Sequence, residues 1–206
     1  MMSKPKTHLD KSLQRRVQIG KAAASVFNKK GYLETNMDDI AAAAKLSKGG
    51  LYHYFSSKDE ILFFILDSYM DIVLEDLDDQ VRVRRDSTSK IQFIIERHID
   101  LYANHISEAK TLLHDAHCLS AEHHKRISAK ERDYYRLVIG VLSEFFEGSA
   151  YVKRDELKAL AFVLFGMCNW TYHWYDPKRP IKPNELSKII WTVFLRGITE
   201  RRKRKG

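Results

Sequence analysis

Histidine, cysteine and acidic side chains crowd the stretch HDAHCLSAEHH, residues 114–124, where metal chemistry is conceivable. His114 and His117 stand three positions apart and would share one face of a helix, which suits a zinc site. The chain nevertheless contains no HExxH, no GxSxG, no phosphate loop ending in GK[ST] and no CxxC pair. We therefore expect no enzyme, no catalytic residues, no cofactor and no metal site, and keep a metal-sensing protein as a minor alternative.

Basic and aromatic side chains surround two glycines in KLSKGGLYHYFSSKDE, residues 45–60. Glycine costs about 1 kcal/mol relative to alanine inside a helix, so Gly49 and Gly50 need a reason. Without a Cβ they let the backbone approach another molecule closely, and the N–H groups at a helix start favour phosphate. The side chains expected to point outward or to flank this helix are Lys48, Tyr52, His53 and Lys58. This combination favours contact with double-stranded DNA.

The charge distribution indicates two functions in one chain. The net charge of +8 is uneven: residues 1–60 carry 11 Lys or Arg against 6 Asp or Glu, and residues 196–206 carry 6 against 1. Residues 61–195 carry 18 against 20. A basic end on a near-neutral body suggests that one part meets a polyanion, although a solvated lysine surface is the simpler alternative. The tail RRKRKG, residues 201–206, is too charged to pack and is expected to be disordered.

Composition limits the class of protein. Apolar residues make up 44% of the 206 residues, enough for a sizeable core. No apolar run approaches the roughly 18 residues of a membrane span, and the lysine-rich start lacks the apolar stretch of a signal peptide. Two isolated cysteines, Cys118 and Cys168, fit a reducing compartment. We expect a cytoplasmic protein with no membrane partner.

The elements that must position these side chains are helices. Gly31 is placed to end a first helix, Asn36 to cap a second that can hardly pass Ala44, and Ser47 to cap a third. Ser57 and Glu60 form a capping box ahead of a longer helix. The first helix is expected to bury one face, formed by Leu13, Val17, Gly20, Ala24 and Phe27. The third is expected to turn Leu51 and Phe55 inward, with Tyr54 half-buried. Three helices, the last two joined by a tight turn, predict a helix-turn-helix domain over residues 10–58.

The stretch GYLETNMDDIAAAAKLSKGGLYHYFSSKDEIL resembles the DNA-binding domain of the TetR family of bacterial transcriptional regulators. The resemblance implies an all-α fold and a homodimeric repressor on a palindromic operator, released by a small effector. It implies an effector-binding and dimerisation domain over residues 59–200, with the last two long helices forming the dimer interface. The DNA-binding residues it implies are Thr35, Asn36, Lys48, Gly49, Gly50, Tyr52, His53 and Lys58. Lys45 replaces the usual glycine of the turn, which predicts strain there.

A narrower resemblance lies in NWTYHWYDPKRPIKPNEL, residues 169–186, which is similar to a branch of the family that senses acyl-CoA thioesters. Trp170 and Trp174 are four apart, are expected to share a helix face, and could line an apolar pocket or a dimer seam. The ligand-binding residues we expect are Trp170, Trp174, His98 and Tyr102 for the apolar wall and Arg132 and Arg136 for the CoA phosphates. The plain alternative for the arginines is a solvated basic face. An apolar drug or a free fatty acid, which needs only the wall, remains the alternative effector.

Overall fold

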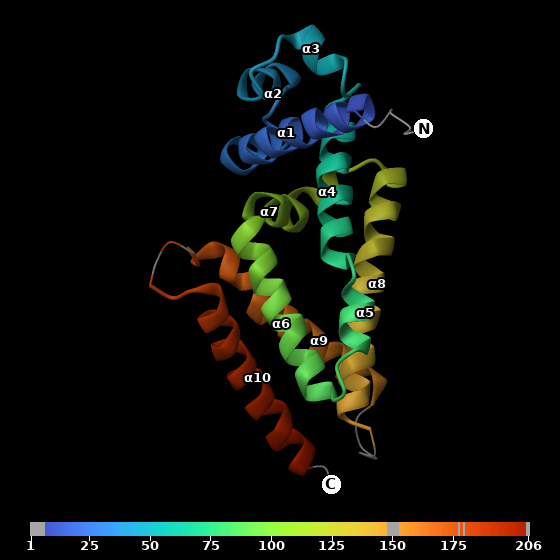
Figure 1. Ribbon diagram of the computed structural model, residues 1–206, viewed down its shortest axis with the longest axis vertical. Helices are drawn as coiled ribbons and strands as arrows, with labels where there is room; N and C mark the ends of the chain where they lie inside the picture. The colour runs from blue at the N-terminus through green and yellow to red at the C-terminus, as the bar shows by residue number, and fades with distance from the viewer. Residues whose placement is uncertain (1–6, 148–152, 177, 179, 205–206) are drawn as a thin grey trace, which may run out of the picture. The chain divides into compact units, whose positions relative to one another are not determined.

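The computed structural model describes residues 7–147, 153–176, 178 and 180–204 (Figure 1). Helices and short 3-10 turns are its regular structure, and no strand occurs among those residues. The predicted all-α fold class is thus confirmed. Across the described ranges, no helix combines the length and the apolar character needed to cross a membrane.

The chain forms two compact units. The first comprises Met1–Asp71 and Ser107–Ser128. It contains α1 (Thr7–Lys30), α2 (Met37–Ala43), α3 (Lys48–Tyr52), most of α7 (Ile106–Asp115), η1 (Ala116–Cys118) and the beginnings of α4 (Lys58–Leu74) and α8 (Ala121–Phe145). The second comprises Ile72–Ile106 and Ala129–Gly206. It contains α5 (Leu77–Arg82), α6 (Ser87–Asn104), α9 (Arg154–Asn169), η2 (Trp170–His173), α10 (Pro183–Arg204) and the remainders of α4 and α8. The expected domain boundary between residues 58 and 59 stays a prediction.

In the first unit, α1 crosses α4 (Figure 1). Gly20 permits the close approach, since a Cβ there would lie 3.4 Å from both Phe64 and Ile65 of α4. The buried side chains of α1 are Ile19, Ala23, Ala24 and Phe27. The expected face was therefore right at its C-terminal end and wrong at its start, because Leu13 and Val17 are exposed.

Two turns of this unit use the left-handed backbone region. Gly31 has a φ of +92° and donates its N–H to the carbonyl oxygen of Phe27 at 2.8 Å, as the predicted helix end requires. Lys45 has a φ of +54° in the turn between α2 and α3. A side chain with a Cβ is unfavourable in this region, so the strain predicted at Lys45 is confirmed.

The second unit is organised around α6, which packs against α10, α9 and α5 (Figure 1). Its buried core takes side chains from five helices, among them Ile95 of α6, Leu142 of α8, Leu164 of α9 and Phe194 of α10. Arg97 of α6 donates from Nη2 to the carbonyl oxygens of Ile72 at 2.9 Å and Glu75 at 2.7 Å. The guanidinium therefore satisfies carbonyl groups left open where α4 ends.

The C-terminal segment differs from the sequence-based expectation. Pro183 begins α10, as the fixed φ of proline favours at the first position of a helix. The helix then continues to Arg204. The prediction of a disordered tail over residues 201–206 is therefore corrected for 201–204, and residues 205–206 lie outside the described residues. Lysine and arginine are good helix formers, and their charge complements the negative end of the helix dipole.

Candidate DNA-binding surface and effector site

The start of α2 is fixed by a reciprocal capping box. The N–H of Asp39 donates to Oδ1 of Asn36 at 2.9 Å, and the N–H of Asn36 donates to Oδ2 of Asp39 at 2.9 Å. The Nζ of Lys30 lies 2.6 Å from the same Oδ2. The Asn36 N–H bond, together with the Lys30 ammonium, holds the pKa of the Asp39 carboxyl below its usual value. Asn36 thus caps the helix as predicted, and its contact with DNA stays a prediction.

The two glycines of α3, Gly49 and Gly50, differ in what surrounds them. The Oγ of Ser47 accepts the N–H of Gly50 at 3.1 Å, which confirms the predicted cap. A Cβ on Gly50 would lie 3.1 Å from that Oγ and would press on the cap. A Cβ on Gly49 would meet nothing within 4 Å. Gly50 is therefore explained by the fold, whereas Gly49 leaves bare backbone facing open space.

The aromatic residues around α3 divide between core and surface as predicted. Leu51 and Phe55 are buried, and Phe55 packs edge-on against Phe64 with ring centroids 5.4 Å apart. Tyr52 and His53 are exposed, and Tyr54 is half-buried. The exposed pair can reach a groove, but the structure contains no DNA and their contacts stay predictions.

Two residues predicted to contact DNA are used by the fold instead. Thr35 is buried, and its Oγ1 donates to the carbonyl oxygen of Gly31 at 2.7 Å. The Nζ of Lys58 donates to three carbonyl oxygens of the α1–α2 connection, those of Tyr32, Leu33 and Thr35, at 2.6, 3.3 and 2.7 Å. An ammonium has three N–H donors, so Lys58 is fully engaged and does not point outward. The predicted outward roles of Thr35 and Lys58 are corrected accordingly.

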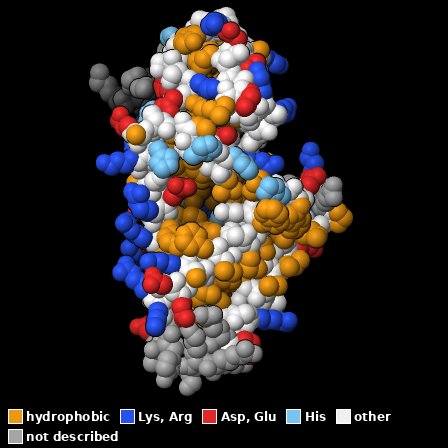
Figure 2. Space-filling view, turned by 180° about the vertical axis from the view of Figure 1, so that it is seen from behind, with side chains coloured by type: hydrophobic (Ala, Val, Ile, Leu, Met, Phe, Trp, Pro, Cys, Tyr) orange, Lys and Arg blue, Asp and Glu red, His pale blue; other side chains and the backbone are white. Residues whose placement is uncertain are grey.

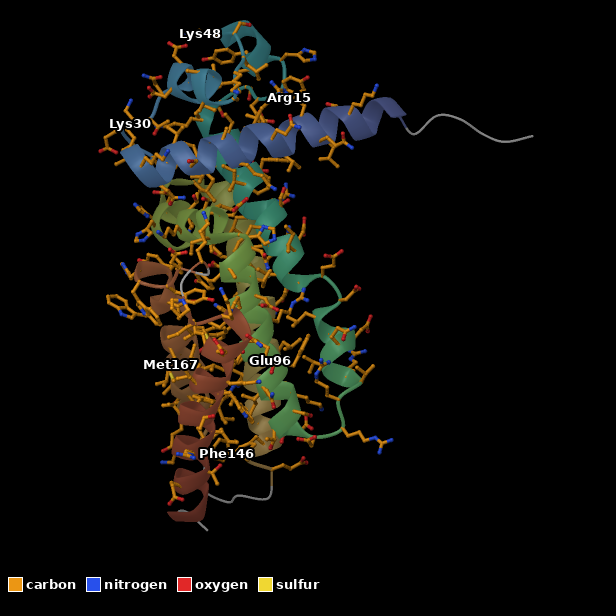
Figure 3. All side chains as sticks on the ribbon, turned by 60° about the vertical axis from the view of Figure 1, so that its left-hand side comes forward. Arg15, Lys30, Lys48, Glu96, Phe146 and Met167 are labelled. Carbon is orange, nitrogen blue, oxygen red and sulfur yellow. The ribbon has the colours of Figure 1, made fainter. Side chains whose placement is uncertain are left out.

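Other cations remain near the surface of this unit. Figure 3 shows Lys48 on α3 and Arg15 on α1, both from the same unit. Lys48 is exposed and pairs with Asp38 at 3.1 Å. Arg15 donates from Nη2 to the carbonyl oxygen of Ala44 at 3.2 Å, next to the turn that precedes α3. Sequence reasoning missed Arg15, because only the fold brings α1 beside the end of α2.

The second unit contains a polar network among the candidate effector residues. The two ring nitrogens of His98 lie 2.9 Å from the hydroxyl of Tyr134 and 2.9 Å from Oδ1 of Asn169. The hydroxyl of Tyr102 donates to the same Oδ1 at 3.0 Å. The network joins α6, α8 and the end of α9, and it brings together His98 and Tyr102 as predicted. Tyr134 and Asn169 were missed as site residues.

The hydrogen-bond partners of His98 define which of its ring nitrogens carries the proton. Oδ1 of Asn169 can only accept, so Nε2 of His98 carries the proton, and Nδ1 accepts from the Tyr134 hydroxyl. Burial lowers the pKa of His98 to about 4, partly opposed by the bond to Asn169. The imidazole is therefore neutral near pH 7. Phe165 packs on one side, with ring centroids 6.0 Å from His98 and 5.4 Å from Tyr134.

The predicted tryptophan wall is not formed with this network. Trp170 and Trp174 are 64% and 52% exposed. The helix α9 changes to a 3-10 turn at Trp170, and three residues per turn place His173 beside it, with ring centroids 4.2 Å apart. The expectation that the two tryptophans share a helical face is therefore wrong, and their exposure fits the dimer-seam alternative better.

The predicted phosphate-binding arginines are also separated from the network. Arg132 and Arg136 are exposed on α8, and Arg136 pairs with Asp133 at 3.1 Å. Each lies two positions from Tyr134, which corresponds to about 200° around an α-helix and hence to the opposite face. Their role in holding phosphates stays a prediction, and the solvated basic face is the arrangement observed.

The histidine-rich stretch is used for packing. His123 stacks on Phe63 with ring centroids 4.1 Å apart, and its Nδ1 lies 2.5 Å from Oδ2 of Asp59. The N–H of Ser120 donates to Oδ1 of Asp59 at 2.8 Å. Within the described ranges, no group of three or more His, Cys, Asp or Glu side chains could hold a metal ion.

A capped helix-turn-helix in one unit and a second, separate helical unit in the same chain define the class of a DNA-binding regulator. Two family models match the chain: "Bacterial regulatory proteins, tetR family" over residues 19–64, and "Tetracyclin repressor-like, C-terminal domain" over residues 84–198. The second alone spans more than half of the chain. The chain therefore belongs to the TetR family, and it is a transcriptional regulator rather than an enzyme.

Individual relatives are similar to this chain over most of their length. The chain is 27% identical over 195 residues to the HTH-type transcriptional repressor KstR2 of Rhodococcus jostii, covering 89% of this chain and 91% of that protein. A TetR-family regulator from Bordetella parapertussis superimposes with a TM-score of 0.83 at 29% identity, covering 87% and 93%. AibR, solved in complex with isovaleryl coenzyme A and operator DNA, superimposes with a TM-score of 0.76 at 24% identity, covering 87% and 97%. The last likeness is one of fold.

Proposed function

We propose that the protein is a homodimeric repressor that binds a palindromic operator and is released from it by an acyl-CoA or aryl-CoA thioester. The observation that carries the proposal is the presence of two different candidate sites in one chain, one exposed and one largely buried. One is the exposed face of α3, and the other is the polar network around His98 in the second unit. Two relatives support the same function: the Rhodococcus relative is named a repressor, and AibR was solved with isovaleryl coenzyme A and operator DNA.

The DNA contact is proposed for the exposed face of α3. Gly49 leaves room for close approach of the backbone, and Tyr52, His53 and Lys48 are exposed around it. A recognition helix in the major groove presents such side chains to base edges and phosphates. Two subunits would place their α3 helices about 34–36 Å apart on a palindromic site, one helical turn of DNA.

The homodimer is proposed to form through α9 and α10. Phe162 and Gly166 of α9 and Trp170, which begins η2, follow one another at intervals of four and are exposed. On α10, an exposed series with the same interval consists of Ile189, Val193 and Gly197. A Cβ on either glycine would meet nothing within 4 Å, so another helix can approach closely at both places. Figure 2 shows hydrophobic side chains gathered on the side that carries α10. Apolar stripes of this kind suit a four-helix interface with a second copy.

The effector is proposed to act through the second unit without contacting DNA. A ligand that binds one conformation of the dimer better than the other lowers DNA affinity by linkage. The thioester is favoured over an apolar drug or a free fatty acid because the network offers neutral hydrogen-bonding groups. A carboxylate placed there would be desolvated without a cation in the network to pair with it.

The test is a mobility shift on the operator, located first by footprinting upstream of the gene itself. A range of acyl-CoA and aryl-CoA esters is added, with free CoA and the matching free acids as controls. We expect at least one ester to release the DNA, and the controls to do so far less well. Release by the free acids alone would favour the fatty-acid alternative, and binding with no preferred site would contradict the repressor.

A further inference from the structure

The side-chain amide of Asn169 is satisfied on one side only. Its Oδ1 accepts two hydrogen bonds, from Nε2 of His98 and from the hydroxyl of Tyr102. Among the residues that the structure describes, none accepts a hydrogen bond from its Nδ2. Asn169 is partly buried, at the junction between α9 and η2. The network therefore ends in an amino group with two N–H donors that no described protein group uses.

The orientation of this amino group is fixed by the rest of the network. His98 uses both ring nitrogens, one on Tyr134 and one on Asn169, so it cannot turn to serve another partner without losing a bond. Two bonds to Oδ1 hold the amide plane, and the Nδ2 must then point away from His98 and Tyr102. A donor held in this way is preorganised for an incoming acceptor, because it loses little further conformational entropy when the acceptor binds.

We propose that Nδ2 of Asn169 is the recognition group for the effector and donates a hydrogen bond to the carbonyl oxygen of its thioester. The inference rests on the proposed function and names the atom that would read the acyl group. It also specifies the chemical class, which is a neutral acceptor such as the carbonyl of a thioester. His98 stays uncharged near pH 7 and offers no positive charge to a carboxylate.

The acyl carbonyl and the CoA phosphates of such an effector would be bound by different residues. The carbonyl would be read by Asn169, supported by side chains of α6 and α8. The exposed arginines of α8 lie on the opposite helix face from Tyr134, so they are not needed for this contact. Loss of the carbonyl and loss of the Nδ2 donor should therefore have the same effect on binding.

The test uses the full-length dimer and isothermal titration calorimetry. A panel of CoA esters that includes isovaleryl-CoA identifies the tightest thioester, and its S-alkyl thioether, with CH₂ in place of the carbonyl, is then compared. We expect the thioether to bind roughly tenfold more weakly, as the loss of one hydrogen bond allows. Asn169→Asp keeps an oxygen for His98 and Tyr102 and removes the donor. Because it also adds a carboxylate, the variant is judged by its preference for the thioester over the thioether.

In the Asn169→Asp variant, the roughly tenfold preference for the thioester over the thioether should be lost, because the donor that distinguishes the two ligands is gone. Asn184→Asp, at an exposed position in the first turn of α10, makes the same chemical change elsewhere and should leave both affinities unaltered. Equal binding of thioester and thioether to the unmodified protein would overturn the inference and leave the repressor standing. Binding of no ester at all would overturn the acyl-CoA effector and this inference together.

Discussion

Lys58 donates a hydrogen bond from Nζ to the carbonyl oxygen of Thr35 at 2.7 Å, across 23 positions of the chain. The same ammonium lies over the ring of Tyr32, 4.3 Å from its centroid, and also donates to the Tyr32 carbonyl oxygen. The first turn of α4 is in this way tied to the connection that positions α2. Lys48 differs, because it is 61% exposed at the start of α3.

Replacing Lys58 by methionine should destabilise the DNA-binding unit. Three carbonyl oxygens would lose their donor, and charged hydrogen bonds contribute about 1.5–3 kcal/mol to stability. We expect the free energy of unfolding, measured by urea titration, to fall by about that amount. An unchanged urea midpoint, with a decrease in DNA affinity only, would instead restore Lys58 as an outward phosphate contact.

Replacing Lys48 by methionine should have the opposite pattern. The side chain is exposed, and its ion pair with Asp38 is worth little, so stability should change by less than about 0.5 kcal/mol. If the ammonium contacts a phosphate, the slope of log K against log salt should become shallower by about 1. The measurement is operator binding over a series of salt concentrations. The same slope in both proteins would exclude Lys48 from the interface.

Gly49→Ala should stabilise the protein and weaken DNA binding. Alanine is favoured over glycine in a helix by about 1 kcal/mol, and a Cβ at this position meets nothing within the subunit. A groove that approaches the bare backbone would meet this methyl group. Gly50→Ala is the control, because its Cβ would press on the Ser47 cap and cost stability instead. Unchanged operator affinity in Gly49→Ala would show that DNA does not approach α3 at that point.

The sequence was most informative where the determining contacts are local. Hydrogen bonds between residues at most five positions apart form the caps at Asn36 and Ser47. The same is true of the left-handed turns at Gly31 and Lys45. Even there, one detail was wrong. The N–H of Glu60 bonds to Oγ of Ser57 as predicted, but its carboxylate accepts from Ser56 rather than completing the box with Ser57.

The effector site was predicted less completely, because it joins distant parts of the chain. His98 meets Tyr134 and Asn169 across 36 and 71 positions, and no spacing rule connects such residues. The signal available was the Asn-Trp pair at residues 169–170, in which the amide, and not the large ring, joins the network. The tryptophans were misplaced because the change from α-helix to 3-10 turn at Trp170 cannot be read from apolar spacing.

The stability of the protein should depend on pH through His98. In the unfolded chain its imidazole takes up a proton near pH 6.5, whereas in the folded chain burial lowers the pKa to about 4. Between these values the unfolded state binds more protons. The free energy of unfolding should therefore fall as pH drops from 6.5 to 4, by at most about 3 kcal/mol, and level off below that.

The matched variant is His98→Gln, which cannot take up a proton in this range but retains a donor and an acceptor. Urea unfolding at a series of pH values should show a steeper loss of stability in the unmodified protein than in this variant. The other histidines are common to both proteins, so they cancel in the difference. Parallel curves would mean that His98 is protonated equally well in the folded and unfolded chains.

The proposed dimer interface predicts the effect of a single charge on α10. Val193 is 58% exposed in the subunit, and on the proposed interface a second copy would bury it. Val193→Asp would place a carboxylate without a partner in that contact, at a cost that a helix interface cannot easily absorb. We expect light scattering to show a monomer, and operator affinity to fall at least about a hundredfold because the two half-sites are no longer bound together. Val83→Asp, at a valine that is 73% exposed at the end of α5, is the control and should remain a dimer with normal operator affinity. A dimeric Val193→Asp protein would place the subunit contact elsewhere and leave the exposed stripes of α9 and α10 without this explanation.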